Sequence, residues 1–119
     1  MSTMNLTQDG YAVVLNAVTS TVRNLHLFTE EGELEGYGYA PLPVVPTEWN
    51  GNRYPTQEWL FTAGPQTRVR GYYVTGAEGK VLWSREFPVS ERAPDDYIIG
   101  RDRDRIAVTL TFGLLAGNQ

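Results

Sequence analysis

Residues 59–87 read WLFTAGPQTRVRGYYVTGAEGKVLWSREF and hold three runs of aromatic and β-branched residues, the types that favour strands. Ala63-Gly64-Pro65 ends the first run, because proline cannot donate to a strand ladder. Gly76-Ala77-Glu78-Gly79 separates the other two, and its glycines accept a positive φ. The pattern predicts three consecutive strands, of which 67–75 and 80–87 form a β-hairpin.

Strand patterns continue on both sides of this stretch. Alternation of side-chain types predicts strands at 22–29, 34–40 and 106–114, and a shorter one at 97–99. With turn signals at short intervals, the chain reads as about six or seven strands. This is typical of an all-β protein built as an antiparallel β-sandwich, either jelly-roll or immunoglobulin-like, because periodicity does not reveal strand order.

The first part of the chain has a different pattern. Residues 1–8 are polar and predict a flexible N-terminal arm, which leaves 9–119 as a single β-sandwich domain. Apolar residues in 9–18 have helical spacing, but several of them, including Val13 and Val14, are β-branched. The segment therefore predicts either a short helix or a strand.

Composition limits the classes of function. The chain of 119 residues has no cysteine, which excludes disulfides, thiolate catalysis and Cys-ligated metals. Its net charge of -4 disfavours nucleic-acid binding, which needs Lys and Arg opposite phosphates. No apolar run approaches the ~20 residues that span a bilayer, and the N-terminus lacks a signal-peptide pattern, so we expect no membrane contact and synthesis in a cytoplasm.

Catalytic and metal-binding motifs are weak. His26 is the sole histidine and lies within a predicted strand, so we expect a structural role. Four aspartates invite a calcium interpretation, but their spacing fits no known loop and arginines alternate with two of them: Asp95, Asp96, Asp102 and Asp104. Mutual salt bridging on a solvated turn is the favoured interpretation. We expect no enzyme activity, no cofactor and no metal.

Acidic residues 30, 31, 33 and 35 could supply the paired carboxylates of a glycosidase, but a solvated turn is the simpler interpretation. Loop aromatics suggest a binding surface, since aromatic residues and arginine are enriched at interface hot spots. Trp59 and Trp83 are predicted in the core. The predicted partner-binding residues are Tyr37, Tyr39, Trp49, Arg53 and Tyr54.

Five segments carry a family resemblance. They are Leu25-His26-Leu27-Phe28, Gly36 to Ala40, Trp59 to Gly64, Val69 to Phe87 and Ile106 to Leu114. In this order they resemble a group of small virion-associated structural proteins of tailed bacteriophages. The resemblance covers most of the chain from about Val22, and the Gly71-Tyr72-Tyr73-Val74 and Leu82-Trp83 elements are its most distinctive parts. Residues 41–54 depart from it, being proline-rich where a plainer strand and loop are expected.

The resemblance implies a component of the virion, made in the host cytoplasm. One hypothesis is a capsid decoration or cement protein that binds the major capsid protein or other virion proteins and stabilises the head shell. The other is a tail, baseplate or fibre component that binds a host-surface glycan or protein. Both imply a homo-oligomer, either a dimer or a trimer.

Overall fold

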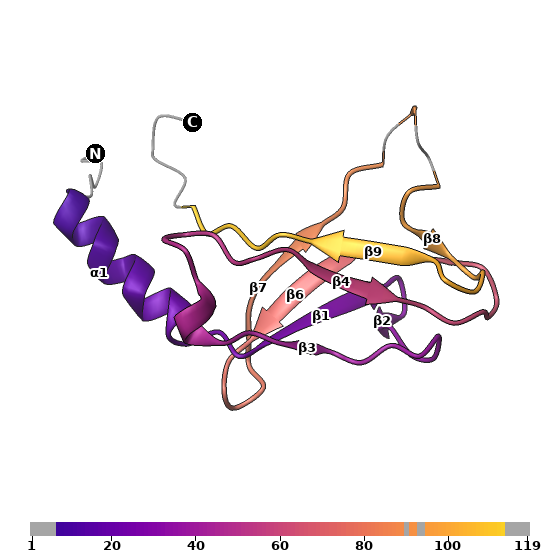
Figure 1. Cartoon of the computed structure of the whole chain (residues 1–119), viewed down its shortest axis with the longest axis horizontal. Helices are drawn as coiled ribbons and strands as arrows, with labels where there is room; N and C mark the ends of the chain where they lie inside the picture. Colours follow the sequence, from indigo (N-terminus) through magenta and orange to yellow (C-terminus); the bar gives the residue numbers. More distant parts are fainter. Residues whose placement is uncertain (1–6, 90, 93–94, 114–119) are drawn as a thin grey trace.

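The computed structural model describes residues 7–89, 91–92 and 95–113, and within them it is mostly β, with antiparallel sheets and one short α-helix (Figure 1). The elements are α1 Gln8–Thr19, β1 Asn24–Thr29, β2 Gly32–Glu33, β3 Leu42–Pro43, the 3-10 helix η1 Pro46–Glu48, β4 Gln57–Leu60, β5 Thr67–Arg68, β6 Gly71–Thr75, β7 Val81–Glu86, β8 Ile98–Ile99 and β9 Arg105–Val108. No helix in these residues is long and apolar enough to cross a membrane.

The largest sheet has the strand order β2-β1-β6-β7, and β3 also pairs with β1. All pairings are antiparallel, and β4–β9 and β5–β8 form two further ladders. The predicted hairpin is confirmed: β6 pairs with β7, with Val74 opposite Trp83 and a bulge after Val74. The preceding run does not extend this hairpin, because β4 pairs with β9 instead.

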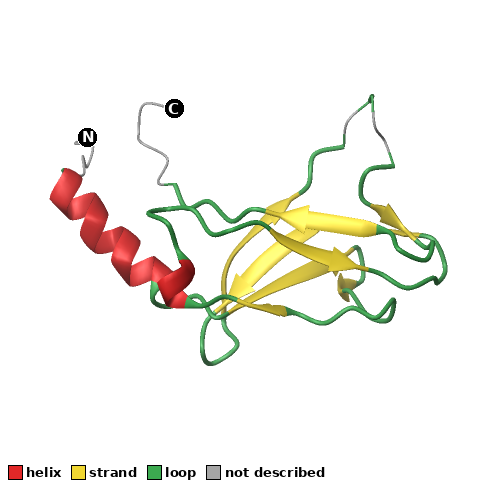
Figure 2. Ribbon diagram, in the orientation of Figure 1, coloured by secondary structure: helices red, strands yellow, loops and turns green. Residues whose placement is uncertain are grey.

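The core lies between the larger sheet and the β4–β9 ladder, which crosses in front of it in Figure 2. Leu25 and Val74 from the sheet are fully buried, and Ile106 and Val108 from β9 are buried, as their alternation predicts. Each such side chain stabilises the fold by about 1.5–3 kcal/mol. Trp59 also lies in the core as predicted, with its indole N–H donating to the Ala40 carbonyl at 2.8 Å.

The predicted strand at 34–40 is wrong. Gly36, Tyr37 and Gly38 have φ of 83°, 59° and 71°, so three consecutive residues take the left-handed conformation. Glycine enters this region freely, and a tyrosine there is uncommon. The alternation of glycine and tyrosine therefore marks a tight loop, and β2 is confined to Gly32–Glu33.

The predicted strand 67–75 is interrupted where it changes partners. The Val69 N–H bonds to the Tyr97 carbonyl beside β8, and the next N–H, of Arg70, bonds to the Phe28 carbonyl in β1. The change of partner shifts the alternation, so that Val69 and Tyr72 are both buried although they lie three positions apart.

The predicted strand 106–114 is shorter than expected, since β9 ends at Val108. Beyond it the chain still pairs with loop 50–54: the Tyr54 N–H bonds to the Leu110 carbonyl, and the Phe112 N–H to the Asn52 carbonyl. Leu114 lies outside the described residues.

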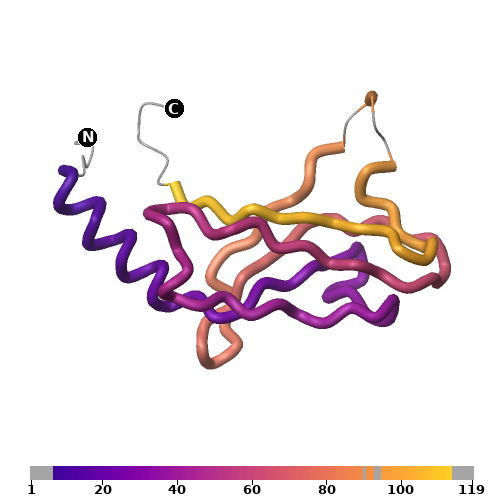
Figure 3. The backbone as a smooth tube through the Cα atoms, in the orientation of Figure 1, coloured from indigo at the N-terminus to yellow at the C-terminus, as the bar shows by residue number. Residues whose placement is uncertain are grey.

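Of the two predictions for the N-terminal segment, the helix is confirmed. The Thr7 hydroxyl accepts the Gly10 N–H at 2.9 Å and caps α1. The helix therefore begins at Gln8, within the predicted arm 1–8, and residues 1–6 of that arm lie outside the described residues. The helix extends away from the sheets (Figure 3). Near its start, the Tyr11 hydroxyl reaches the Phe112 carbonyl at 3.4 Å.

Candidate functional site

An apolar groove of about 940 Å³ lies between α1, strand β7 and residues 111–113. Two of its side chains are large, apolar and strongly exposed: Val13 on α1 is 70% exposed, and Leu82 on β7 is 40% exposed. The remaining lining residues are Val14, Ala17, Val18, Thr21, Tyr72, Trp83, Ser84, Arg85, Thr111, Phe112 and Gly113.

The groove exists because the molecule is incompletely covered at β7. This strand ends the larger sheet and pairs with β6 on one side only. Because β9 ends at Val108, Trp83 packs against the ring of Phe112, 6.0 Å away, and stays only partly buried. The prediction that Trp83 belongs to the core thus holds only in part.

Charge is sparse on both walls of the groove. Asp9, in the first turn, is the one charged residue of α1. Among the described lining residues, Arg85 alone is charged, and the structure gives it no ion-pair partner in the described part of the chain. The groove is therefore an apolar surface with a single positive charge.

A second candidate, the polar cluster, lies on β1, β2 and β6 of the larger sheet and on the loop that follows β2, whereas the groove lies at the β7 edge of that sheet. It consists of His26, Glu33, Tyr39, Tyr73 and Thr75. The carboxylate of Glu33 accepts from Nδ1 of His26 at 2.7 Å and from the hydroxyl of Tyr39 at 2.8 Å. Because a carboxylate only accepts, Nδ1 carries the proton, and Nε2 meets the Thr75 hydroxyl at 2.9 Å. His26 stacks on Tyr73 with 4.5 Å between the ring centroids.

Hydrogen bonding sets the protonation of this cluster. Burial alone would raise the pKa of Glu33, but the bonds from His26 and Tyr39 outweigh it and hold that pKa below the ordinary 4.5. The pKa of Tyr39 is raised by burial and further by the carboxylate of Glu33. Tyr39 also accepts the Leu27 N–H at 3.0 Å, so the cluster extends from the backbone of β1 to the side chain of Thr75.

The order hydroxyl, imidazole, carboxylate is that of a general-base relay, in which the imidazole removes the hydroxyl proton. Here Thr75 is only 4% exposed, which leaves a substrate almost no access to the hydroxyl. The same bonds join β1, β2, β6 and the loop that carries Tyr39. The geometry therefore supports a structural role for His26. It also places the carboxylate of Glu33 in specific hydrogen bonds to His26 and Tyr39, where the sequence predicts a solvated turn.

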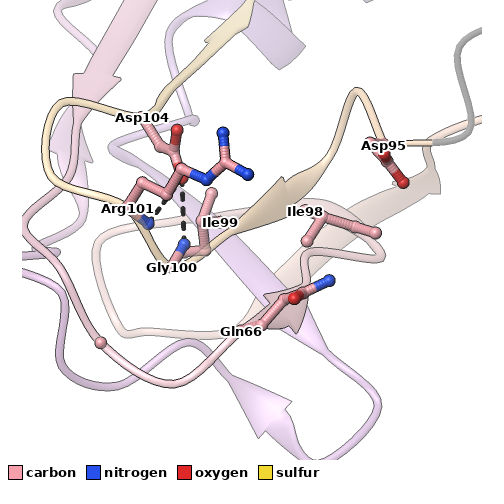
Figure 4. A pocket seen from close by; sticks show the side chains of 8 residues that line it. Gln66, Asp95, Ile98, Ile99, Gly100, Arg101 and Asp104 are labelled. Atoms are coloured by element: carbon pink, nitrogen blue, oxygen red, sulfur yellow. Dashed lines mark hydrogen bonds between the residues drawn. The ribbon is translucent and has the colours of Figure 1, made fainter.

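A smaller pocket of about 300 Å³ lies beside β8 (Figure 4). The carboxylate of Asp104 accepts the N–H groups of Gly100 and Arg101 at 3.0 and 2.9 Å, while Asp95 lies apart from it. No group of three or more His, Asp or Glu in the described residues is placed to hold a metal ion. Arg105 pairs with Glu58 on β4 at 3.6 Å. The turn 100–105 is therefore stabilised by hydrogen bonds from backbone N–H groups to the Asp104 carboxylate and by an ion pair between β9 and β4.

Three of the predicted partner-binding residues lie in one loop. Tyr54 is buried, and its hydroxyl accepts the Val45 N–H at 2.9 Å. Trp49 is partly buried and packs edge-on against Tyr54, with ring centroids 5.3 Å apart. Arg53 is exposed and closes a tight turn through its backbone with Asn50. That Trp49, Arg53 and Tyr54 bind a partner stays a prediction.

The other two lie in the loop at 36–40. The Tyr37 hydroxyl bonds to the Pro65 carbonyl, and Tyr39 belongs to the polar cluster. None of the five predicted residues is among the described residues that line the groove. One wall of the groove is indicated by the sequence, since Val14 and Val18 have helical spacing. The position of Leu82 opposite them depends on the fold and cannot be read from the sequence.

A scan against models of protein families, a search of curated proteins and a search of solved structures each found no match for this chain. The functional argument therefore rests on the residues and their geometry.

Proposed function

We propose that the chain is a structural protein of a tailed-bacteriophage particle, most simply a capsid decoration protein that binds the major capsid protein and stabilises the head shell. The observation that carries this proposal is the apolar groove, in which Val13 and Leu82 stand exposed beside a helix that leaves the body of the molecule. The resemblance of residues 69–87 and four other segments to small virion proteins supports it.

The physical mechanism is burial of apolar surface at many equivalent sites. Burying a fully exposed valine or leucine side chain contributes about 1.5–3 kcal/mol, and Val13 and Leu82, at 70% and 40% exposed, gain the corresponding part of it. A single copy then needs only modest affinity, because contacts repeated over a shell add up through multivalency. Subunits bridged in this way resist the outward pressure of packaged DNA.

We propose a non-enzymatic role as well. The one relay-like arrangement described, from Thr75 through His26 to Glu33, has its hydroxyl in a residue that is 4% exposed. Its bonds hold strands together, which is what a stable binding domain requires.

We further propose that the architecture is an open β-sandwich. Leu25 and Val74 of the larger sheet share one buried cluster with Trp59 and Ile106 of the β4–β9 ladder, as facing sheets do. The strand order of the larger sheet, β2-β1-β6-β7, is the feature to compare with the jelly-roll and immunoglobulin-like topologies.

Quantitative mass spectrometry of purified particles tests the function. A decoration protein follows the symmetry of the shell, so we expect on the order of hundreds of copies per particle. A few copies or a few dozen would instead favour the tail, baseplate or fibre alternative, in which the partner is a host-surface glycan or protein. Absence from the particle would contradict the proposal.

A second experiment tests the mechanism. Particles that lack the protein should burst at a lower temperature, and added wild-type protein should restore the burst temperature. Leu82→Ser protein should restore it less well, because it removes exposed apolar surface from the groove. Val89→Ser is the control, since Val89 is an apolar residue that is still more exposed, at 67%, and lies outside the groove.

A further inference from the structure

Helix α1 is poorly equipped to be stable by itself. It has only 12 residues, near the lower limit for a helix in water. It includes Gly10 and β-branched residues such as Val14 and Val18, all of which have low helix propensity. One apolar side chain, Val13, is 70% exposed beside the groove. The side of the helix that carries Val13 is therefore left uncovered by the described part of the chain.

We propose that a second copy of the chain covers this side of the helix: α1 of each protomer lies in the groove of the other. Such an exchange is isologous, so one two-fold axis covers both helices and both grooves at once. Val13 of each copy then contacts the wall formed by Leu82 and Trp83 of the other. This inference goes beyond particle binding, because it concerns the protein free in solution, where no capsid protein covers the groove; on the particle, the capsid protein takes the place of the second copy.

Charge complementarity favours a second α1 as the occupant. The helix carries one charge, the carboxylate of Asp9, and has no basic residue. The groove carries one charge of the opposite sign, the guanidinium of Arg85, which lacks an ion-pair partner among the described residues. A helix that enters the groove by its first turn brings its Asp9 toward Arg85, and the two-fold axis repeats this pair.

Charge reversal tests this arrangement by sedimentation equilibrium over a range of protein concentrations. Wild-type protein should form dimers. Arg85→Glu and Asp9→Arg should each raise the dissociation constant at least tenfold, because each places like charges together. The double variant Asp9→Arg/Arg85→Glu should recover most of the affinity, a result that general damage to the fold would not give. Arg70→Glu is the control, an exposed charge reversal outside the groove.

An apolar variant keeps the test independent of charge. Val13→Ala removes apolar contact yet raises helix propensity, so it should weaken the dimer without lowering helicity by circular dichroism. A wild-type protein that is monomeric at all concentrations would overturn the inference. A dimer whose dissociation constant is unchanged by these variants would also overturn it. A monomer that binds particles through Val13 and Leu82 would also overturn it, and would assign the groove to another particle protein. A dimer without particle binding would uphold it while removing the proposed function.

Discussion

The polar cluster and the apolar groove lie in different parts of the same sheet, the groove at its edge strand β7, and they differ in how completely the chain provides partners for their side chains. Around Glu33, the hydrogen-bonding groups of His26, Tyr39 and Thr75 all find partners within the chain. In the groove, Val13 and Leu82 remain exposed to water. The hydrogen-bonding groups of the cluster are satisfied within one chain, whereas we propose that a partner covers the apolar side chains of the groove.

The largest effect is expected at Gly71, because its strand β6 lies between β1, which carries His26 of the cluster, and β7, which lines the groove. A Cβ at this position would lie 2.1 Å from the Arg85 carbonyl and 2.8 Å from the Phe28 ring. Gly71→Ala must therefore separate β6 from its neighbours, and we expect it to lower the free energy of unfolding by about 3 kcal/mol or more. Gly113→Ala is the control, since its Cβ would meet nothing within 4 Å. Equal urea midpoints for the two variants would contradict this account of the sheet.

A smaller effect separates the two regions directly. Thr75→Val removes a buried hydroxyl and leaves Nε2 of His26 without that partner, so we expect a loss of ~1–2 kcal/mol in unfolding free energy. The same change at Thr111, an exposed residue of the groove, should stay within about 0.5 kcal/mol. Urea denaturation of both proteins at a concentration where each is monomeric measures the difference. A larger loss at Thr111 would reverse the comparison.

The cluster also predicts a pH dependence. The pKa of Glu33 in the folded protein lies below its ordinary value of 4.5, so the unfolded chain takes up this proton first as the pH falls. The stability that the carboxylate contributes is complete above about pH 4.5 and is lost as the pH falls through the folded pKa. Glu33→Gln should therefore lose less stability than wild type between about pH 6 and about pH 3. If the urea midpoints of Glu33→Gln and wild type fall equally over this pH range, the hydrogen bonds to Glu33 are not the cause of the pH dependence.

The smallest effect is expected at an exposed ion pair that belongs to neither region. Arg105 and Glu58 lie 3.6 Å apart, with side chains 62% and 50% exposed. Water screens such pairs, so Glu58→Gln should change the free energy of unfolding by less than about 0.5 kcal/mol. A thermal or urea melt checks this, and a loss as large as that of Thr75→Val would show that surface charge matters more here than burial.

Local signals in the sequence predicted local structure well. The glycines of the turn 76–79 and the alternation of Val81 to Phe87 predict the β6–β7 hairpin, because a tight turn fixes the register of its strands. For residues 9–18 the sequence does not decide between helix and strand, because the spacing of the apolar residues favours a helix and their β-branching favours a strand. The Gly36-Tyr37-Gly38 loop was missed, because an alternation of glycine with tyrosine looks like a strand unless φ is known.

Non-local pairing could not be predicted. That β4 pairs with β9 depends on which strands meet in space, which periodicity does not encode. The polar cluster shows the same limit: His26 and Glu33 are joined by one turn, but Thr75 reaches them only through the register that sets His26 opposite Tyr73. The groove likewise requires the second half of α1 to lie near β7, although the two are distant in sequence.

Amide hydrogen exchange of wild-type protein at low and high concentration tests the central contrast most directly. If a second copy completes the groove, amides of α1 at 11–18 should become more protected as the concentration rises. Amides of β6 at 72–74, which are closed within one chain, should keep the same local protection. Exchange of α1 that does not depend on concentration would contradict the account.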